Sequence, residues 1–241
     1  MLTITIPTES PDLDSSTEDY ASRFAGPVGE YFLDVQWNIV ESMLPRGRCR
    51  VLDVGGGHGQ LAGRLSEAGY DVSILGSDDS CVPRLNRLFV PGSFEFITGD
   101  LLDLPFDNQT FDVVLAFRLL PHLRHWQRFV GEICRVADQR VILDYPDLRS
   151  VNWFGEKLFG LKKSIETNTR RYTCFHRNQI RTAVKQNGFD HCDLQGQFLA
   201  PMALHRLCRT PWLSKLIENP FRRIGITNIL GSPIICKADR I

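Results

Sequence analysis

Residues 51–59 read Val-Leu-Asp-Val-Gly-Gly-Gly-His-Gly and carry the strongest chemical signal in the chain. An apolar strand is expected to end at the carboxylate of Asp53. The backbone then turns through Gly55, Gly56, Gly57 and Gly59. Glycine tolerates positive φ and lets a ligand approach without a Cβ in the way. A helix that starts near Gln60 would add unpaired N–H groups and a positive dipole end, so the segment predicts a ligand-binding turn.

The glycine spacing narrows the type of ligand. A dinucleotide fingerprint requires Gly-x-Gly-x-x-Gly, in which the pyrophosphate sits on the helix N-terminus. Here the spacing is Gly55-x-Gly57-x-Gly59, and Asp53 would place a negative charge close to a pyrophosphate. A ligand that carries a positive charge and several hydroxyls fits these residues better.

Three acids, Asp53, Asp78 and Asp100, stand at the expected carboxyl ends of three successive strands. In a parallel sheet those ends share one edge, so the acids should face the same crevice. An acid about 20 residues beyond the glycine turn is placed to accept hydrogen bonds from ribose hydroxyls. Asp78 fits that position, and its neighbour Asp79 competes for it. A single such acid would be read as a turn or helix cap, but three acids in register with a glycine turn indicate a nucleoside site.

Strands and helices are expected to alternate along the chain. The predicted strands are Arg50–Val54, Tyr70–Leu75, Phe94–Thr98, Phe111–Phe117, Arg140–Asp144, Phe189–Leu199 and Gly231–Lys237. The predicted helices are Tyr20–Leu44 with a break at Gly26–Gly29, Leu61–Ala68, Pro83–Phe89, Trp126–Val136 and His176–Asn187. Short connections between such elements predict an α/β fold with a doubly wound, mostly parallel sheet.

One domain is expected to span residues 17–241. Residues 1–16 are polar and rich in Ser, Thr, Pro and Asp, which is typical of a flexible N-terminal tail. Two insertions, at about 149–175 and 200–230, interrupt the alternation and are expected to form a helical lid.

The segment Asp53-Val-Gly55-Gly-Gly57-His-Gly59 resembles the first motif of class I S-adenosylmethionine (SAM)-dependent methyltransferases, in particular the methyltransferase type 11 (UbiE-like) superfamily. The resemblance covers about Tyr20 to Asp144 and implies a seven-stranded, Rossmann-like sheet. It also implies SAM as cofactor. The chain departs from the family before the fifth strand, where Arg135–Arg140 is shorter than the usual Lys-Pro-Gly-Gly turn, which leaves the shape of that loop open.

The resemblance also implies roles for individual residues. Asp53 would lie near the methionine part of SAM, with the glycines giving backbone access, and Asp78 would hold the ribose. Asp100, in Gly99-Asp100-Leu101, matches the acid that holds the adenine amino group. Leu101 and Phe117 complete the expected cofactor-binding set.

The segment after the fourth strand, Arg118-Leu-Leu-Pro-His122-Leu-Arg-His125, faces cofactor and acceptor in the family. His122 is a candidate general base, because histidine ordinarily titrates near neutral pH. The alternative is that His122 caps or packs under the loop. The Asn/Asp-Pro-Pro-Tyr/Phe motif of amino-directed nucleic-acid methyltransferases is absent here, and so is a Pro-Cys nucleophile, which disfavours a nucleic-acid acceptor.

The two insertions supply candidate acceptor-binding and surface residues. Aromatic and basic side chains interleave over 149–181. We take Tyr172 and His176 from this stretch, together with Arg118 after the fourth strand, as candidate substrate-binding residues. Such interleaving also suits single-stranded nucleic acid. Residues 201–230 have the profile of a basic amphipathic helix that could make peripheral contact with an anionic membrane. We favour the alternative that this stripe packs on the protein's own core.

Composition sets broader limits. Residues 1–148 hold 12 Arg and 22 acids, whereas residues 149–241 hold 16 Lys or Arg and 6 acids. The positive charge of the second half suits an anionic partner, and the alternative is that it neutralises the negative first half. Seven dispersed cysteines without C-x-x-C spacing indicate neither a disulfide framework nor a metal site. Without an apolar run of membrane length or a secretory leader, we expect a cytoplasmic protein.

These observations favour a SAM-dependent methyltransferase with a small-molecule acceptor, either anionic or lipid-linked. An RNA methyltransferase is the first alternative, because the second half is basic. A SAM-binding partner protein without turnover is the second. The sequence fixes neither the acceptor atom nor the oligomeric state.

Overall fold

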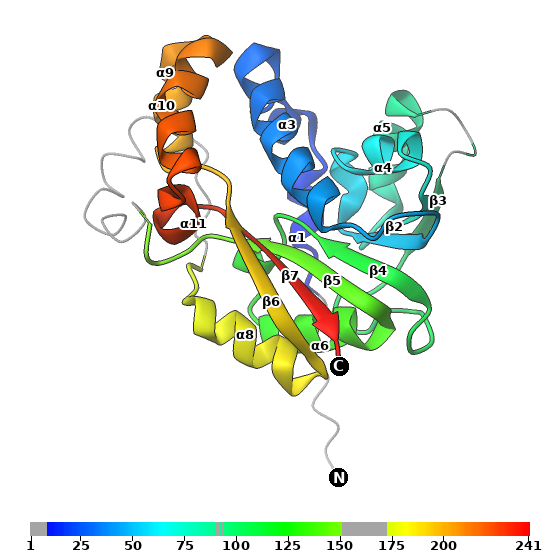
Figure 1. Ribbon diagram of the computed structural model, residues 1–241. Coiled ribbons are helices and arrows are strands. Elements are labelled where there is room, and N and C mark those ends of the chain that lie inside the picture. The colour runs from blue at the N-terminus through cyan, green and yellow to red at the C-terminus, as the bar shows by residue number, and fades with distance from the viewer. Residues whose placement is uncertain (1–8, 90–91, 93, 151–172) are drawn as a thin grey trace.

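The fold is organised around a seven-stranded sheet in the order β3-β2-β1-β4-β5-β7-β6 (Figure 1). The computed structural model describes residues 9–89, 92, 94–150 and 173–241. The strands are β1 (Arg50–Val54), β2 (Asp71–Gly76), β3 (Glu95–Thr98), β4 (Phe111–Ala116), β5 (Ala137–Tyr145), β6 (Phe189–Gly196) and β7 (Ile234–Arg240). Strand β7 pairs antiparallel with β5 and β6, and the pairs among β1–β5 are parallel. The predicted α/β class, with a doubly wound and mostly parallel seven-stranded sheet, is confirmed.

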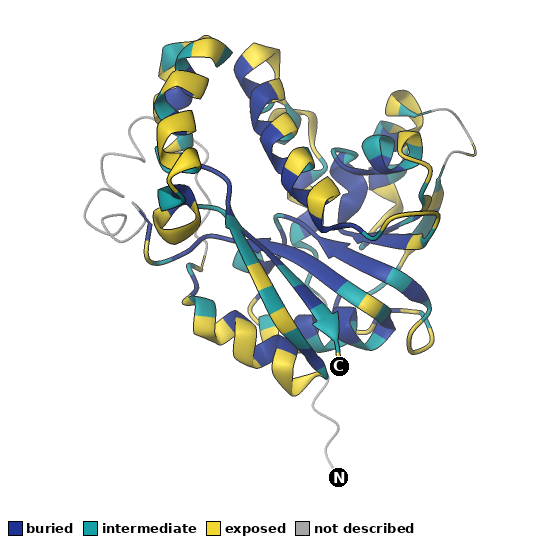
Figure 2. Cartoon of the chain, in the orientation of Figure 1, coloured by how far each residue is buried: buried dark blue, intermediate teal, exposed yellow. Residues whose placement is uncertain are grey.

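Helices cover both faces of the sheet (Figure 1). One core layer joins the sheet to α3 (Gly26–Met43), α4 (Ala62–Glu67) and α5 (Val82–Leu88), and the other joins it to α6 (Trp126–Val136) and α8 (Arg177–Gln186). Strand β4 feeds both layers in alternation: Val113 and Leu115 enter the first, Val114 and Ala116 the second. The central strands are therefore apolar on both faces, as Figure 2 shows by their burial.

The strand order reverses beside β1, which lies between β2 and β4. From β1 the chain adds β2 and β3 on one side, and then returns to add β4 and β5 on the other. In such sheets, ligands bind outside the carboxyl ends of the strands at this reversal. The register places Asp53 of β1 between Ile74 of β2 and Leu115 of β4, one residue from the end of the strand.

The remaining described elements are short or lie at the ends of the chain. They are α1 (Pro11–Ser15), α2 (Glu18–Ser22), η1 (Gly56–His58), η2 (Asp79–Cys81), η3 (Leu120–His122), α9 (Met202–Cys208), α10 (Pro211–Arg223) and α11 (Ile226–Leu230). Among the helices of the described residues, none is long and apolar enough to cross a membrane.

Residues 9–16 correct the predicted flexible tail. They include α1, and Asp12 within it is fully buried. The predicted helix break at Gly26–Gly29 is instead the first turn of α3. Pro27 is tolerated there because the N–H it lacks would be unpaired in a first turn. A Cβ at Gly29 would lie 2.2 Å from the carbonyl of Phe24, so this glycine serves close packing rather than a break.

Residues 201–230 form three helices instead of the single amphipathic helix that we expected. Arg209 adopts a left-handed conformation with φ 55°, and Pro211 then opens α10. Gly225, with φ 78°, separates α10 from α11. Positive φ at these two positions interrupts the helical path that the apolar spacing suggests.

Candidate functional site

Asp53 is the most unusual residue at the carboxyl edge of the sheet. Its side chain is fully buried, and neither carboxyl oxygen has a hydrogen-bond partner. Burial raises the pKa of Asp53 to about 7. A buried carboxyl without partners is costly, and more so when it is ionised. A ligand that brings a positive charge or hydrogen-bond donors would remove that cost.

The glycine turn lies directly over this carboxyl group. Gly55 and Gly59 have φ of 71° and 70°, a conformation that favours glycine, and the N–H of Gly55 donates to the carbonyl of Leu75 at 2.7 Å. A Cβ on Gly56 would lie 2.4 Å from Oδ2 of Asp53. The turn therefore fits against Asp53 only because position 56 has no side chain.

Protein atoms occupy the space that side chains at the other turn positions would take. A Cβ on Gly55 would lie 2.4 Å from Cδ1 of Leu119, and one on Gly57 would lie 2.5 Å from Oγ of Ser16. We expected these glycines to leave room for a ligand. In the structure they leave room for the chain's own residues, so their contact with a ligand stays a prediction.

His58 lies within the turn and is buried as a neutral imidazole. Burial lowers its pKa to about 3, and the positive charges of Arg118 and Arg84 act in the same direction. Its Nδ1 accepts a hydrogen bond from the N–H of Gln60 at 3.2 Å. At neutral pH, the cations near the turn are thus arginines and not this histidine.

The acids beyond β2 and β3 accept hydrogen bonds from neighbouring protein groups. Asp78 is exposed, and its Oδ1 accepts from the N–H of Ser80 at 2.8 Å; the side chain of Ser80 and then this N–H lower the pKa of Asp78. Asp79 accepts from the hydroxyl of Thr98. Asp100 accepts from the N–H of Leu102 at 2.8 Å. Since a carboxylate can accept about four hydrogen bonds, these capping roles are compatible with the predicted ligand roles and do not test them.

Leu101 and Phe117 are buried in opposite core layers, Leu101 on the α6 side and Phe117 on the α3 side. Their backbone follows Asp100 and β4 respectively, which puts both at the carboxyl edge of the sheet. Contact of either residue with a cofactor remains a prediction.

Arg118 connects three parts of the chain. Its N–H donates to Oδ1 of Asp144 at 2.6 Å, and its Nη2 donates to Oε1 of Gln36 at 2.7 Å. The guanidinium lies over the ring of Phe24, 3.9 Å from the centroid. Its Nη1 is buried without a partner, as is Nε2 of Gln36. Two unused donors therefore lie beside the carboxyl ends of β4 and β5.

Asp144 and Gln36 are site residues that we did not predict. Asp144 is buried next to the last residue of β5, and burial raises its pKa to about 6 although its hydrogen bond from Arg118 acts against this. Like Asp53, Asp144 is an acid near the end of a predicted strand, and this position in the sequence could have marked it as a candidate. Gln36 lies on α3 without any motif to mark it.

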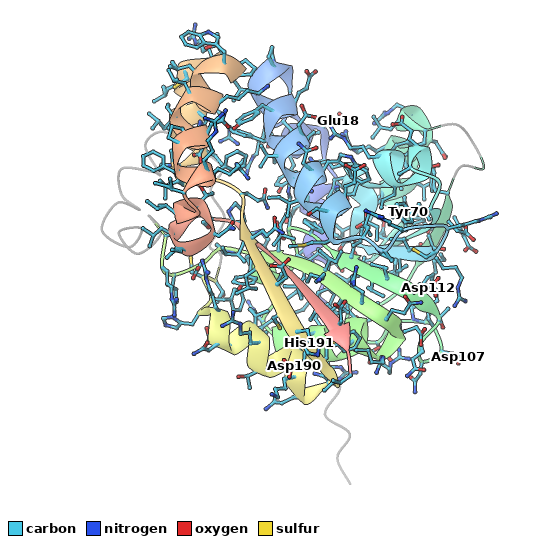
Figure 3. All side chains as sticks on the ribbon, in the orientation of Figure 1. Glu18, Tyr70, Asp107, Asp112, Asp190 and His191 are labelled. Atoms are coloured by element: carbon cyan, nitrogen blue, oxygen red, sulfur yellow. The ribbon has the colours of Figure 1, made fainter. Side chains whose placement is uncertain are left out.

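Residues 9–22, which we call the N-terminal strap, cross the same edge. Asp12 accepts hydrogen bonds from the N–H and the hydroxyl of Ser77 at 2.8 and 2.7 Å. Glu9 accepts from the N–H groups of Arg124 and His125 at 2.6 and 3.0 Å. Glu18, labelled in Figure 3, pairs with Arg84 and Arg87 of α5 at 2.7 Å each. The strap thus joins the tip of β2 to α5 and to the segment after β4.

The other predicted residues are placed as follows. His122 ends η3 and is half-buried. His176 is exposed just before α8, and its N–H donates to Oε1 of Gln179 at 2.8 Å, so it caps that helix. Tyr172 lies outside the described residues. Within the described part of the chain, no three His, Cys, Asp or Glu side chains are grouped so that they could hold a metal ion.

A pH titration of stability tests the state of Asp53. In the unliganded protein this carboxyl stays protonated up to about pH 7, whereas in the unfolded chain it ionises near 3.8. Between these values the folded state binds more protons, so the contribution of Asp53 to stability falls as pH rises. We expect the unfolding free energy of Asp53→Asn to rise relative to that of the wild type as the pH increases from 4 to 7, by up to about 4 kcal/mol.

Urea unfolding at several pH values measures this difference. Asp71→Asn removes an exposed acid at the start of β2 and serves as the control for the loss of one negative charge. A difference between Asp53→Asn and wild type that stays constant with pH would contradict the assignment.

Comparison with known proteins agrees with this geometry. Residues 52–143 match the family described as methyltransferase domain. The chain is 39% identical over 110 residues to phthiotriol/phenolphthiotriol dimycocerosates methyltransferase of Mycobacterium leprae, a match that covers 44% of this chain and 40% of that protein. It is 35% identical over 92 residues to sterol 24-C-methyltransferase erg6 of Schizosaccharomyces pombe, covering 36% of this chain and 24% of that one. The matches thus span less than half the length of these relatives.

Solved structures match the fold over almost the whole chain. A SAM-dependent methyltransferase of Thermotoga maritima, a possible histamine N-methyltransferase by its description, superposes with TM-score 0.68 at 13% identity and covers 95% of this chain and 99% of that one. Magnesium protoporphyrin IX methyltransferase of Synechocystis, with bound S-adenosylhomocysteine, gives TM-score 0.60 at 18% identity and covers 95% and 97%. Residues 52–143 match the methyltransferase-domain family, and the chain around them has the class I methyltransferase fold that the resemblance implied.

Proposed function

We propose that this protein is a SAM-dependent methyltransferase and that its acceptor is a small, lipid-linked molecule. The observation that carries the proposal is the buried, unpaired carboxyl of Asp53 under the glycine turn, within the segment that matches a methyltransferase domain. A positively charged ligand suits this carboxyl, whereas a dinucleotide pyrophosphate would be repelled by it.

The residues at the strand tips fit SAM part by part. Asp53 would favour the positively charged methionine end, Asp78 the ribose hydroxyls and Asp100 the adenine amino group. The last two carboxylates keep unused acceptor positions beyond their capping bonds. When bound, SAM would supply an activated methyl group. The chain's own part would then be to hold and align the acceptor and to exclude water.

The names of the relatives support a lipid-linked acceptor. They include methyltransferases of phthiotriol and phenolphthiotriol dimycocerosates and of a sterol. The unused donors of Arg118 and Gln36 would hold a polar group of the acceptor near the transfer point. His122 is the candidate base for an acceptor that must lose a proton.

Calorimetric titration with SAM tests the assignment of the ribose acid. We expect Asp78→Asn to weaken SAM binding about tenfold or more, because it exchanges a charged acceptor for a neutral amide. Asp79→Asn should change the affinity little, because the resemblance gives the ribose role to Asp78 and not to its neighbour. Asp71→Asn, which replaces an exposed acid at the start of β2, is the control. Equal losses for Asp78→Asn and Asp79→Asn, or no loss for either, would overturn the assignment.

A transfer assay tests the function itself. The protein is incubated with SAM that carries tritium in its methyl group, together with a lipid extract or total RNA from the source cells. We expect label in the organic phase of the lipid reaction and a reduction of about tenfold or more with Asp78→Asn. Label in the RNA would replace the lipid-linked acceptor by a nucleic acid. SAM binding without any transfer would indicate a non-catalytic SAM-binding protein.

A further inference from the structure

Helices α9, α10 and α11 stand beside α3 above the sheet (Figure 1). Helix α10 contacts α3, α9 and α11. None of the strand-tip residues discussed above lies on these three helices, so their sequence is not explained by SAM binding.

The polarity of α10 is inverted with respect to a typical surface helix. Its two fully buried residues are Ser214 and Glu218, which are four positions apart and thus share one face. Trp212 and Leu216, also four apart, are 66% and 62% exposed. An ordinary surface helix turns its apolar stripe to the core. Here the apolar stripe points to solvent.

Buried hydrogen bonds hold α10 in this orientation. The carboxylate of Glu218 accepts from the N–H groups of Leu199 and Ala200 at 2.9 Å each and lies 3.0 Å from Nε2 of His205. Although burial alone would raise the pKa of Glu218, these hydrogen bonds hold it below its usual value. Rotating α10 to bury Trp212 and Leu216 would break them, so the exposed stripe is a fixed feature of the fold.

The exposed apolar side chains gather on these helices. Of the ten large apolar side chains that are exposed in the described part of the chain, eight lie between Leu204 and Leu230. The eight, which we call the apolar face, are Leu204, Leu207, Trp212, Leu216, Phe221, Ile224, Ile229 and Leu230. Figure 2 shows the exposed positions along these helices. Such a concentration marks an interaction surface.

The exposed charged residues between Leu204 and Leu230 are all positive. Arg209, Lys215 and Arg223 are exposed on the same helices. Between residues 197 and 238 the sequence contains one acid, Glu218, and it is buried. Apolar side chains with tryptophan among them, flanked by cations on a segment without an exposed acid, match the interface of a bilayer that contains anionic lipids.

We propose that the apolar face docks this protein on an anionic lipid bilayer. Trp212, Leu216 and their apolar neighbours enter the boundary between headgroups and acyl chains, while Arg209, Lys215 and Arg223 contact the headgroup phosphates.

Docking would also bring the bilayer close to the candidate site. His205 of α9 packs edge-on against Phe32 of α3, with ring centroids 5.9 Å apart. Gln36, one turn further along α3, bonds the side chain of Arg118. The access of a lipid-linked acceptor rests on the proposed function, whereas the docking itself does not.

Vesicle sedimentation of the full chain tests the proposal. The vesicles are pure phosphatidylcholine, or an equal mixture of phosphatidylcholine and phosphatidylglycerol, at low and high salt. We expect binding to the mixed vesicles at low salt and much weaker binding to the neutral ones. Trp212→Ser combined with Leu216→Ser should reduce binding about tenfold or more. Arg209→Gln combined with Arg223→Gln should reduce it to a similar extent and weaken its salt dependence.

Leu88→Ser removes an exposed apolar side chain outside the apolar face and is the matched control. Unchanged unfolding midpoints and unchanged SAM affinity separate loss of docking from misfolding. The proposal is overturned if the wild type fails to bind mixed vesicles, or if the double variants bind as well as the control. A concentration-dependent dimer that Trp212→Ser with Leu216→Ser abolishes, without vesicle binding, would assign the face to a second copy of the chain instead.

Discussion

Asp53 is held under the glycine turn by the geometry of the sheet, and its carboxyl group has no partner there. The strand pairing of β1 with β2 and β4 fixes its backbone, and Gly56 lies against its oxygen. A buried carboxyl in this state costs stability at neutral pH, and its pKa is accordingly raised to about 7. The buried carboxyl thus lowers the stability of the fold, and a positively charged ligand would offset this loss. This constraint links the fold to the proposed cofactor.

Burial also shifts the pKa values of other residues at this edge of the sheet. His58 stays neutral because burial and two arginines lower its pKa. Burial raises the pKa of Asp144 to about 6. Arg118 is half-buried, donates its N–H to Asp144 and keeps one buried donor, Nη1, without a partner. The N-terminal strap then ties the tip of β2 to neighbouring elements through Asp12, Glu9 and Glu18. A ligand at this edge would therefore meet a positioned set of polar groups in which the Asp53 carboxyl and one donor of Arg118 are without partners.

Local sequence signals predicted the sheet and the motif well, since apolar runs and glycines act within a few residues. Strand β1 and helix α6 begin and end where we expected. The strap was missed because its polar composition resembles a tail, and its order comes from distant partners such as Ser77. The spacing of 201–230 revealed an amphipathic pattern, but its outward orientation depends on Glu218 meeting the N–H groups of Leu199 and Ala200. Long-range hydrogen bonds of this kind leave no periodic signal.

Proton release on SAM binding measures the central claim most directly. If the positive charge of SAM pairs with the carboxylate of Asp53, binding must lower the pKa of Asp53. Protons then leave the protein when SAM binds slightly below pH 7. Calorimetric titrations in two buffers of different ionisation enthalpy count those protons. The account predicts release of up to about one proton by the wild type and clearly less by Asp53→Asn. Equal release by both proteins, or proton uptake by the wild type, would contradict it.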